Sequence, residues 1–392
     1  MNAEPSVSRQ LSPSLLGHSI ADTGRTRGGT AFPAGPSNSW SDGTVRLVEN
    51  DNIRSLSASG QEGGYSVGMG LSRRHFLSTL GGTAASSLLS SGATRAIAFP
   101  LLKSRFKLSV ITDEISQDLG HALEIASQEF GLGFVELRTM WNKNIINLDE
   151  KEIAETQKLL RKHTLEVTDI ASPLFKTDCP GAPKSKFSPA KPEFGADFPF
   201  EKQGEVLERA VAAAKAVGTD RIRCFDFWRL EDQKPFRAAM NDILRKAAED
   251  AAKVKMTLLL ENEMSCNTAT GAEAARTLHA VQSPNFQLNW DPGNAAYRGE
   301  IAFPDGFQKL PLERMGHMHC KDVMRKPDGT CEWAAMGRGL IDYVGQFRAL
   351  VQGGYRGTVS LETHWHGAGS PEESSRQSFA GMKEQLGKAG AL

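Results

Sequence analysis

Four ionisable side chains lie at or near the ends of apolar segments in the second half of the chain, and together they could hold a divalent cation. They are Glu261, Asp291, His319 and Glu362. Three carboxylates and one imidazole form a hard-to-borderline ligand set that suits manganese, magnesium, cobalt or zinc. Taken singly, each has an ordinary explanation, because a strand-terminal carboxylate often caps a helix and a strand histidine usually packs in the core. Their succession on four consecutive predicted strands favours a shared metal site.

Further polar residues lie on the same strand as His319 or on other predicted strands. His317 and Lys321 are two residues before and after His319, so the three share one face of a strand. Lys321 could hydrogen-bond a substrate or stabilise an enolate oxygen, or it could form an ion pair with a neighbouring carboxylate. Glu136, Arg138 and Arg223 could line a binding pocket, or they could form ion pairs between strands.

The segments that must position these residues alternate between strand and helix. Runs rich in β-branched and aromatic residues predict strands at 107–115, 134–140, 165–172, 221–228, 257–263, 286–291, 316–322 and 358–364. Segments of helical period predict helices at 118–130, 149–163, 201–217, 235–254, 271–281, 341–352 and 371–386.

This alternation predicts an α/β fold in which right-handed crossovers join parallel strands. Eight repeats favour a closed (β/α)₈ barrel, or TIM barrel, whose chemistry lies at the carboxyl ends of the strands. No Gly-x-Gly-x-x-Gly turn follows the first strand, which argues against dinucleotide binding. The stretch 173–200 is long for a connection in such a barrel. An inserted active-site loop and a tolerated surface insertion are equally good interpretations of it.

The first hundred residues carry signals of a different kind. Residues 1–68 are rich in glycine and serine and are expected to be a disordered extension, so that Met69 fits the true start. The run SRRHFL at 72–77 matches the twin-arginine export motif, an apolar stretch follows, and AIA at 96–98 resembles a signal-peptidase site. An ordinary N-terminal helix is the alternative. We expect a leader at 69–98, a catalytic domain at 99–392, and export by the twin-arginine translocase to the periplasm or beyond.

The composition argues against several classes of protein. The 392 residues contain 46 Lys+Arg and 46 Asp+Glu, whereas nucleic-acid binders rely on a basic surplus. The five cysteines form no Cys-x-x-Cys pair, which disfavours a disulfide scaffold or a zinc finger. No apolar run reaches the roughly 18 residues of a membrane span, so no stable membrane anchor is expected. The oligomeric state stays open, and a homo-oligomer is one option.

Five ordered motifs resemble the xylose-isomerase-like barrel superfamily of sugar isomerases and epimerases. The motifs are LLLEN at 258–262, NWDPG at 289–293, GHMHCKDV at 316–323, GRGLIDY at 337–343 and GYRGTVSLE at 354–362. By this resemblance Glu261, Asp291, His319 and Glu362 are the metal ligands, and the two glutamates are the acid and base of the ketose 3-epimerase branch. Arg325, six residues after His319, corresponds to an arginine that these epimerases use on substrate hydroxyls.

Two positions depart from the epimerase pattern. Asn294 stands where the epimerases have a histidine, and the pair Lys321-Asp322 resembles the inosose dehydratase and isomerase branches. The reaction subtype therefore stays open. The residues expected to contact the substrate are Arg325, Lys321, His317, Asn294, Glu136 and Arg223.

We therefore expect a divalent-metal-dependent sugar isomerase or epimerase that transfers protons through a metal-stabilised enediolate. Export favours a small carbohydrate without phosphate, or a keto-sugar. A lyase that cleaves 3-keto-glycosides by the same enolate chemistry and a non-catalytic sugar-binding barrel are the alternatives. DNA repair is disfavoured, because the endonuclease branch of the superfamily uses a three-metal cluster that needs additional ligands.

Overall fold

The computed structural model describes residues 101–189 and 197–392, all of them within one compact unit. The expected N-terminal extension at 1–68 and the expected twin-arginine leader at 69–98 lie outside the described residues. Within the described part, no helix combines the length and the apolar character needed to cross a membrane.

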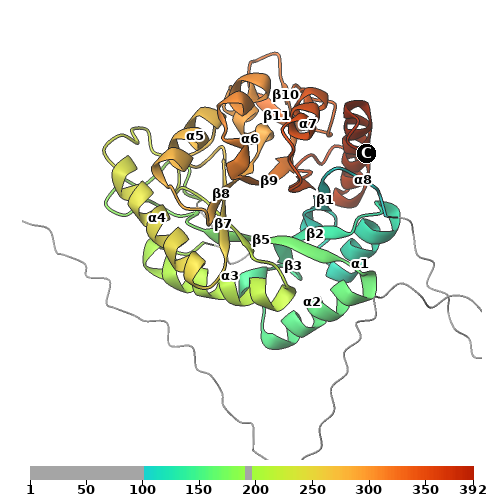
Figure 1. The fold of residues 1–392 in the computed structure, drawn as a ribbon, viewed down its shortest axis with the longest axis horizontal. Coiled ribbons are helices and arrows are strands. Elements are labelled where there is room, and N and C mark those ends of the chain that lie inside the picture. The colour runs from blue at the N-terminus through green and yellow to red at the C-terminus, as the bar shows by residue number, and fades with distance from the viewer. Residues whose placement is uncertain (1–100, 190–196) are drawn as a thin grey trace, which may run out of the picture. The chain divides into compact units, whose positions relative to one another are not determined.

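Eight parallel strands form a barrel, as the alternating pattern predicts (Figure 1). In chain order they are β1 (Lys107–Val110), β2 (Phe134–Leu137), β5 (Glu166–Leu174), β6 (Arg221–Cys224), β7 (Thr257–Glu261), β8 (Phe286–Trp290), β9 (Met315–Cys320) and β12 (Thr358–Leu361). From β2 to β12 each strand pairs with the next one in this series, and β12 pairs with β1. A parallel bridge between Ile111 and Glu136 joins β1 to β2 and completes the ring.

The strands are apolar along their whole length because both of their faces are covered. Leu258, Leu259 and Leu260 of β7 are all fully buried, since successive side chains point alternately into the barrel and toward the helices outside it. Several strands end earlier than the sequence pattern predicts. The expected strand at 107–115 stops at Val110, and a 3₁₀ turn, Thr112–Glu114, follows it at the rim of the barrel.

Eight helices are described around the barrel (Figure 1). They are α1 (Leu119–Glu124), α2 (Glu150–His163), α3 (Gln203–Val217), α4 (Arg237–Lys253), α5 (Gly271–Ala280), α6 (Pro292–Tyr297), α7 (Tyr343–Gln352) and α8 (Pro371–Ala389). All seven predicted helices are present, although the first continues from α1 into a π-helical turn, Ile125–Glu129. Capping boxes begin α2 and α5, where Asp149 pairs with Glu152 and Thr270 with Glu273.

Three short features were not predicted from the sequence. One is α6, whose single turn and a half is too short to show a helical period. The others are the antiparallel pairs β3 (Thr139–Met140) with β4 (Lys143–Asn144) and β10 (Asp322–Arg325) with β11 (Cys331–Ala334). All three follow the carboxyl end of a barrel strand, so they surround the end at which the candidate residues lie.

Candidate metal centre

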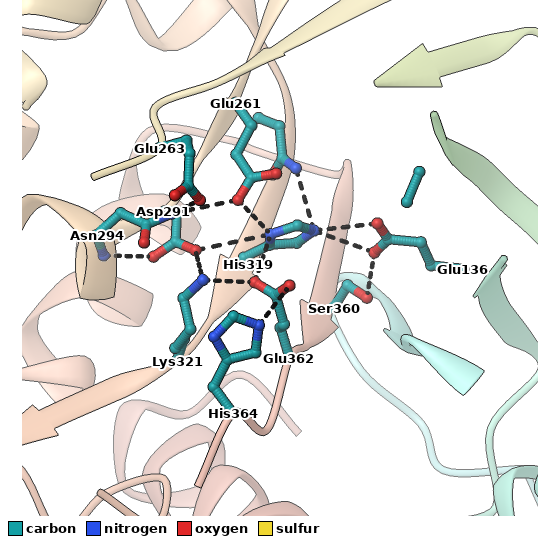
Figure 2. Close-up of polar contacts among 12 residues, drawn as sticks. Glu136, Glu261, Glu263, Asp291, Asn294, His319, Lys321, Ser360, Glu362 and His364 are labelled. Atoms are coloured by element: carbon teal, nitrogen blue, oxygen red, sulfur yellow. Dashed lines mark hydrogen bonds and ion pairs between the residues drawn. The ribbon is translucent and has the colours of Figure 1, made fainter. Parts of the chain in front are cut away.

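The four predicted ligands converge at the carboxyl ends of adjacent strands. Glu261 ends β7, Asp291 follows β8, His319 lies in β9 and Glu362 follows β12. One ligand atom from each lies within 4.8 Å of every other, and all four side chains are buried. Figure 2 shows the three carboxylates directed toward the ring of His319. The sequence-based expectation that these residues meet at one point of the barrel agrees with this geometry.

The two ring nitrogens of His319 face different surroundings. Its Nδ1 atom lies 3.3 Å from Glu362 Oε2, 3.5 Å from Glu261 Oε1 and 3.7 Å from Asp291 Oδ2. Its Nε2 atom lies 3.1 Å from both carboxylate oxygens of Glu136 (Figure 2). The side-chain amide nitrogen of Asn289 also lies 3.1 Å from Nε2. Carboxylates, which only accept hydrogen bonds, face both ring nitrogens, so a cation on Nδ1 would leave the ring proton on Nε2, directed at Glu136. Nδ1 is then the nitrogen with a lone pair for a cation, which is the usual arrangement of a metal-binding histidine.

Asp291 is held by the backbone around it. Asp291 is the N-cap of α6, and its Oδ1 atom accepts a hydrogen bond of 2.8 Å from the backbone N–H of Asn294 in the first turn. Its own backbone N–H donates to Asn262 Oδ1 at 2.7 Å. A Cβ atom at Gly293 would clash with the backbone carbonyl oxygen of Lys321, so glycine lets α6 approach β9 closely. These contacts leave Oδ2 of Asp291 facing the other ligands.

Glu261 is paired with a buried arginine of the neighbouring strand. Arg223 Nη1 lies 3.0 Å from Glu261 Oε2, and the Asn294 side-chain amide donates to Oε1 at 3.2 Å. Burial raises the pKa of Glu261, but Arg223 and His319 outweigh this effect and lower the pKa to about 2. The side chain is therefore a carboxylate, the form that binds a cation or accepts a proton.

Glu362 is surrounded by three cationic or basic groups. Arg138 Nη1 donates to its Oε1 atom at 2.8 Å, and His364 Nε2 lies 3.2 Å from the same oxygen. Lys321 Nζ donates to Oε2 at 2.6 Å. Burial opposes ionisation, yet Lys321 and His364 more than compensate and hold the pKa of Glu362 well below its ordinary value. Both glutamates are thus ionised on opposite sides of the cluster.

Lys321 is fully enclosed between two of the ligand carboxylates. Its Nζ atom lies 2.9 Å from Asp291 Oδ2 and 2.6 Å from Glu362 Oε2. Burial acts against the charged form, but these two carboxylates keep the pKa of Lys321 raised. The ion-pair interpretation of this lysine therefore agrees with the structure. Since a carboxylate oxygen has two lone pairs, the same oxygens can also face a cation.

The site residues fit a divalent cation on two counts. First, Glu261 Oε2, Asp291 Oδ2 and His319 Nδ1 are buried and take part in ion-pair contacts but in no hydrogen bond within the described residues. Second, the carboxylates of the cluster and the pocket wall outnumber the lysine and arginine side chains there. The carboxylates are Asp113, Glu114, Glu136, Glu261, Glu263, Asp291 and Glu362, and the lysines and arginines are Arg138, Lys176, Arg223 and Lys321. A divalent cation would offset part of this negative charge.

A pocket of about 240 Å³ opens beside the cluster. Its walls include Glu261 and Glu362 together with Arg138, Arg223 and Phe225. Drug-sized ligands occupy roughly 300–1,000 Å³, so this pocket suits a smaller, polar molecule. A larger hollow of about 580 Å³ lies among the strand starts, where it is lined by Lys107, Arg221, Gly316 and Thr358, far along the strands from the ligand set.

Within the described residues only the start of the stretch 173–200 borders this pocket, because Pro173 still belongs to β5 and Lys176 follows it by three residues. Pro173 and Lys176 line the wall, and Lys176 Nζ lies 4.7 Å from the centre of the Phe225 ring. Arg138, on a predicted strand, was expected as a possible residue of the pocket wall and does line it. Lys176 and Glu263 were not among the predicted site residues. Glu263 lies two residues after Glu261, so strand position could have indicated it. Lys176 carries no such signal.

Three of the predicted substrate contacts do not line the described pocket. Arg325 is exposed on the β10–β11 hairpin and donates to Gly329 O, because the chain leaves the barrel after Lys321. His317 and Glu136 are fully buried and do not line the pocket. His317 lies one inward-facing layer below His319, since two residues of strand span roughly 6.6 Å.

The other three predicted substrate contacts, Arg223, Asn294 and Lys321, lie at the site. Their side chains mainly contact its carboxylates. Arg223 lines the pocket. Asn294 touches Glu261 and Glu263, and Lys321 touches Asp291 and Glu362.

Curated proteins and solved structures resemble this chain. The putative L-ribulose-5-phosphate 3-epimerase UlaE of Shigella dysenteriae serotype 1 is 26% identical over 190 residues, which cover 48% of this chain and 65% of that protein. UlaE of Escherichia coli strain K12 is 25% identical over the same lengths. The chain thus matches less than two thirds of the length of these relatives.

Solved structures with lower sequence identity share the fold. The probable 3-DHS dehydratase AsbF of Bacillus anthracis superposes with a TM-score of 0.55 at 20% identity, covering 71% of this chain and 98% of that one. The IOLI protein with a zinc atom gives 0.56 at 16% identity, covering 72% and 98%. D-psicose 3-epimerase of Clostridium cellulolyticum H10 with D-tagatose gives 0.53 at 15%, covering 72% and 99%.

The family model described as xylose isomerase-like TIM barrel matches residues 125–385. This range includes all four converging side chains and, from first residue to last, seven of the eight barrel strands. This chain belongs to the xylose isomerase-like TIM barrel family.

Proposed function

We propose that this protein is a divalent-metal-dependent isomerase or epimerase of a small carbohydrate. The observation that carries the proposal is the position of Glu261 and Glu362 at the two ends of an arc of four ligands. Asp291 and His319, from the two strands between them, occupy the middle of the arc. The relatives named as L-ribulose-5-phosphate 3-epimerases support the same reaction class.

Glu261, Asp291, His319 and Glu362 would hold the cation. When bound, a divalent cation polarises a carbonyl and its adjacent hydroxyl and stabilises the negative charge of an enediolate. The chain itself supplies the proton transfers. Glu261 and Glu362 both line the pocket and come from strands separated by β8 and β9, so they approach a bound sugar from different sides. One removes a proton from the carbon beside the carbonyl, and the other returns a proton to the opposite face.

Neighbouring residues keep the two carboxylates ionised and in place. Arg223 and Asn294 hold Glu261, whereas Arg138 and Lys321 hold Glu362. Lys321 also provides a positive charge beside the carbons at which negative charge develops. Such preorganised charges contribute to catalysis because they need no rearrangement during the reaction.

The charge of the pocket supports a substrate without phosphate. Carboxylates outnumber lysines and arginines at the cluster and the pocket wall, and a phosphate would add further negative charge. Lys176 is the only cation of the pocket wall without an ion pair in the described part of the chain. The proposed twin-arginine export also favours a free sugar or keto-sugar. The proposed substrate therefore differs from the sugar phosphate in the names of the curated relatives.

Two measurements test the proposal. Elemental analysis of the purified protein should find one divalent cation per chain. Incubation in D₂O with a panel of ketoses and 3-keto-glycosides should then give a substrate in which one carbon-bound hydrogen is exchanged while the carbon skeleton is kept. Release of a second product would instead indicate a lyase. Sugar binding with no exchange for any compound would indicate a non-catalytic barrel.

A further inference from the structure

A line of alternating carboxylates and imidazoles runs from the metal centre into the interior of the barrel. Its members are His319 and His317 of β9, Glu136 of β2 and Asp169 of β5. All four side chains have 0% exposure. None of the four lines the pocket, but the Nδ1 atom of His319 faces the carboxylates of Glu261 and Glu362.

Each member contacts the next through opposite ends of its polar group. His319 Nε2 lies 3.1 Å from Glu136 Oε1, and Glu136 Oε2 lies 3.3 Å from His317 Nε2. His317 Nδ1 in turn lies 3.2 Å from Asp169 Oδ1. Hydroxyl groups support the carboxylates, because Ser360 donates to Glu136 Oε2 at 2.8 Å and Thr168 donates to Asp169 Oδ1 at 3.0 Å. Figure 2 shows the upper part of this line, with Ser360 beside Glu136.

Packing alone does not account for these residues. The interior of such a barrel is normally filled by branched apolar side chains, and a buried ion pair is often no more stabilising than apolar residues of similar volume. The line therefore places four costly groups where valine or leucine would fit. It contacts the proposed metal site at one atom, Nε2 of His319, whose proton decides which nitrogen can bind a cation.

We propose that Glu136, His317 and Asp169 form a positioning relay for the metal-binding histidine. Glu136 orients the His319 ring and holds its proton on Nε2, so that Nδ1 faces the cation. His317 bridges two carboxylates and fixes Glu136 in the orientation that both of its contacts require. Asp169 holds the far side of His317. This inference rests on the proposed metal site and assigns no contact with substrate to the three residues.

The test measures metal binding in the absence of substrate. Glu136→Gln, His317→Gln and Asp169→Asn are prepared metal-free, and the dissociation constants for Zn²⁺ and Co²⁺ are measured by competition with a chromophoric chelator. Loss of a partner of a metal-binding histidine costs roughly 10- to 100-fold in affinity, and we expect this for E136Q. We expect a smaller but measurable loss for H317Q and D169N. The visible absorption bands of bound Co²⁺ should shift in all three variants, because they report the ligand geometry.

A matched control separates positioning from loss of stability. Gln346 of α7 is also fully buried and hydrogen-bonded, to Trp290 Nε1 at 3.3 Å, but lies outside the relay. Gln346→Leu should leave the Co²⁺ spectrum and the metal affinity unchanged, even if thermal unfolding shifts. If one of the three relay variants does not fold, the Co²⁺ spectra of the other two still test the relay.

Three outcomes would overturn the relay. One is unchanged affinity and an unchanged Co²⁺ spectrum in all three variants. Another is two cations per wild-type chain with one lost in E136Q, because Glu136 and the two histidines would then be ligands of a second cation. The third is a wild type that binds no cation, which would refute the proposed function as well.

Discussion

Lys321 Nζ lies 2.6 Å from Glu362 Oε2 inside a cluster in which both side chains are buried. A cationic side chain therefore shares a carboxylate with the proposed metal ion. Lys321 lowers the negative charge that a cation meets and stabilises the ligand set when no cation is bound. Lys321 and the proposed cation compete for this carboxylate. Loss of Lys321 should therefore lower the stability of the metal-free protein and raise its affinity for the cation.

Lys321→Met should weaken the metal-free fold and strengthen metal binding. Removing one partner of a buried ion pair costs about 3 kcal/mol or more of unfolding free energy, and we expect this loss in the metal-free protein. The cation should bind on the order of tenfold more tightly, because one competing charge is gone. Turnover should fall roughly 100-fold, since a charge that stabilises the enediolate is lost. Chemical denaturation with and without metal measures the first two effects. Equal stability of variant and wild type without metal would contradict this account.

Glu261→Gln and Glu362→Gln should each abolish most of the exchange of hydrogen with D₂O. A positioned acid or base contributes roughly 10²- to 10⁴-fold, and we expect losses in that range for each variant. The matched control is Glu263→Gln, because Glu263 lines the same pocket but is not among the four ligands. Exchange at the wild-type rate in either of the first two variants would rule out the proposed acid–base pair.

Removal of metal should lower the melting temperature of the protein. A ligand at 100 times its dissociation constant stabilises the fold by about 2.7 kcal/mol. Chelation should therefore cost about that amount under matching conditions, and the repulsion among the buried carboxylates adds to the effect. Asp291→Asn should respond much less to the chelator. A melting temperature that is independent of chelator in the wild type would argue against a bound cation.

Gly293→Ala should disturb the metal centre from outside the ligand set. Its Cβ atom would clash with the backbone carbonyl oxygen of Lys321, so α6 and Asp291 must shift. We expect a loss of about 2 kcal/mol or more in unfolding free energy and weaker metal binding. Gly204→Ala in α3 is the control, because nothing lies within 4 Å of its added Cβ atom. That change should stabilise the protein by roughly 0.5–1 kcal/mol. Equal effects of the two substitutions would contradict the close approach at Gly293.

Export by the twin-arginine route remains a proposal of the sequence alone. Replacing both Arg73 and Arg74 by lysine should retain the protein in the cytoplasm, because the translocase reads the paired arginines. Cell fractionation with an antibody against the barrel measures this, and N-terminal sequencing of the exported form should begin at Phe99. Equal distribution of the variant and the wild type would refute the export signal.

The sequence was sufficient to predict the barrel and the four side chains that converge at its rim. Strand and helix periods are local properties, and in a parallel barrel all carboxyl ends of strands lie at the same rim. A charged residue at the end of an apolar strand is therefore placed near its counterparts by the fold class alone. Glu261, Asp291 and Glu362 were found in this way.

Only the tertiary structure decided which groups touch one another across the barrel. His317 shares a strand face with His319 but lies one inward-facing layer of side chains deeper in the barrel. At that depth it contacts Glu136 and Asp169 instead of the pocket. Arg325 follows His319 by six residues, but the β10–β11 hairpin carries it away from the barrel. Both outcomes depend on the depth and path of the chain in space, whereas spacing along one strand specifies only the side on which a residue lies.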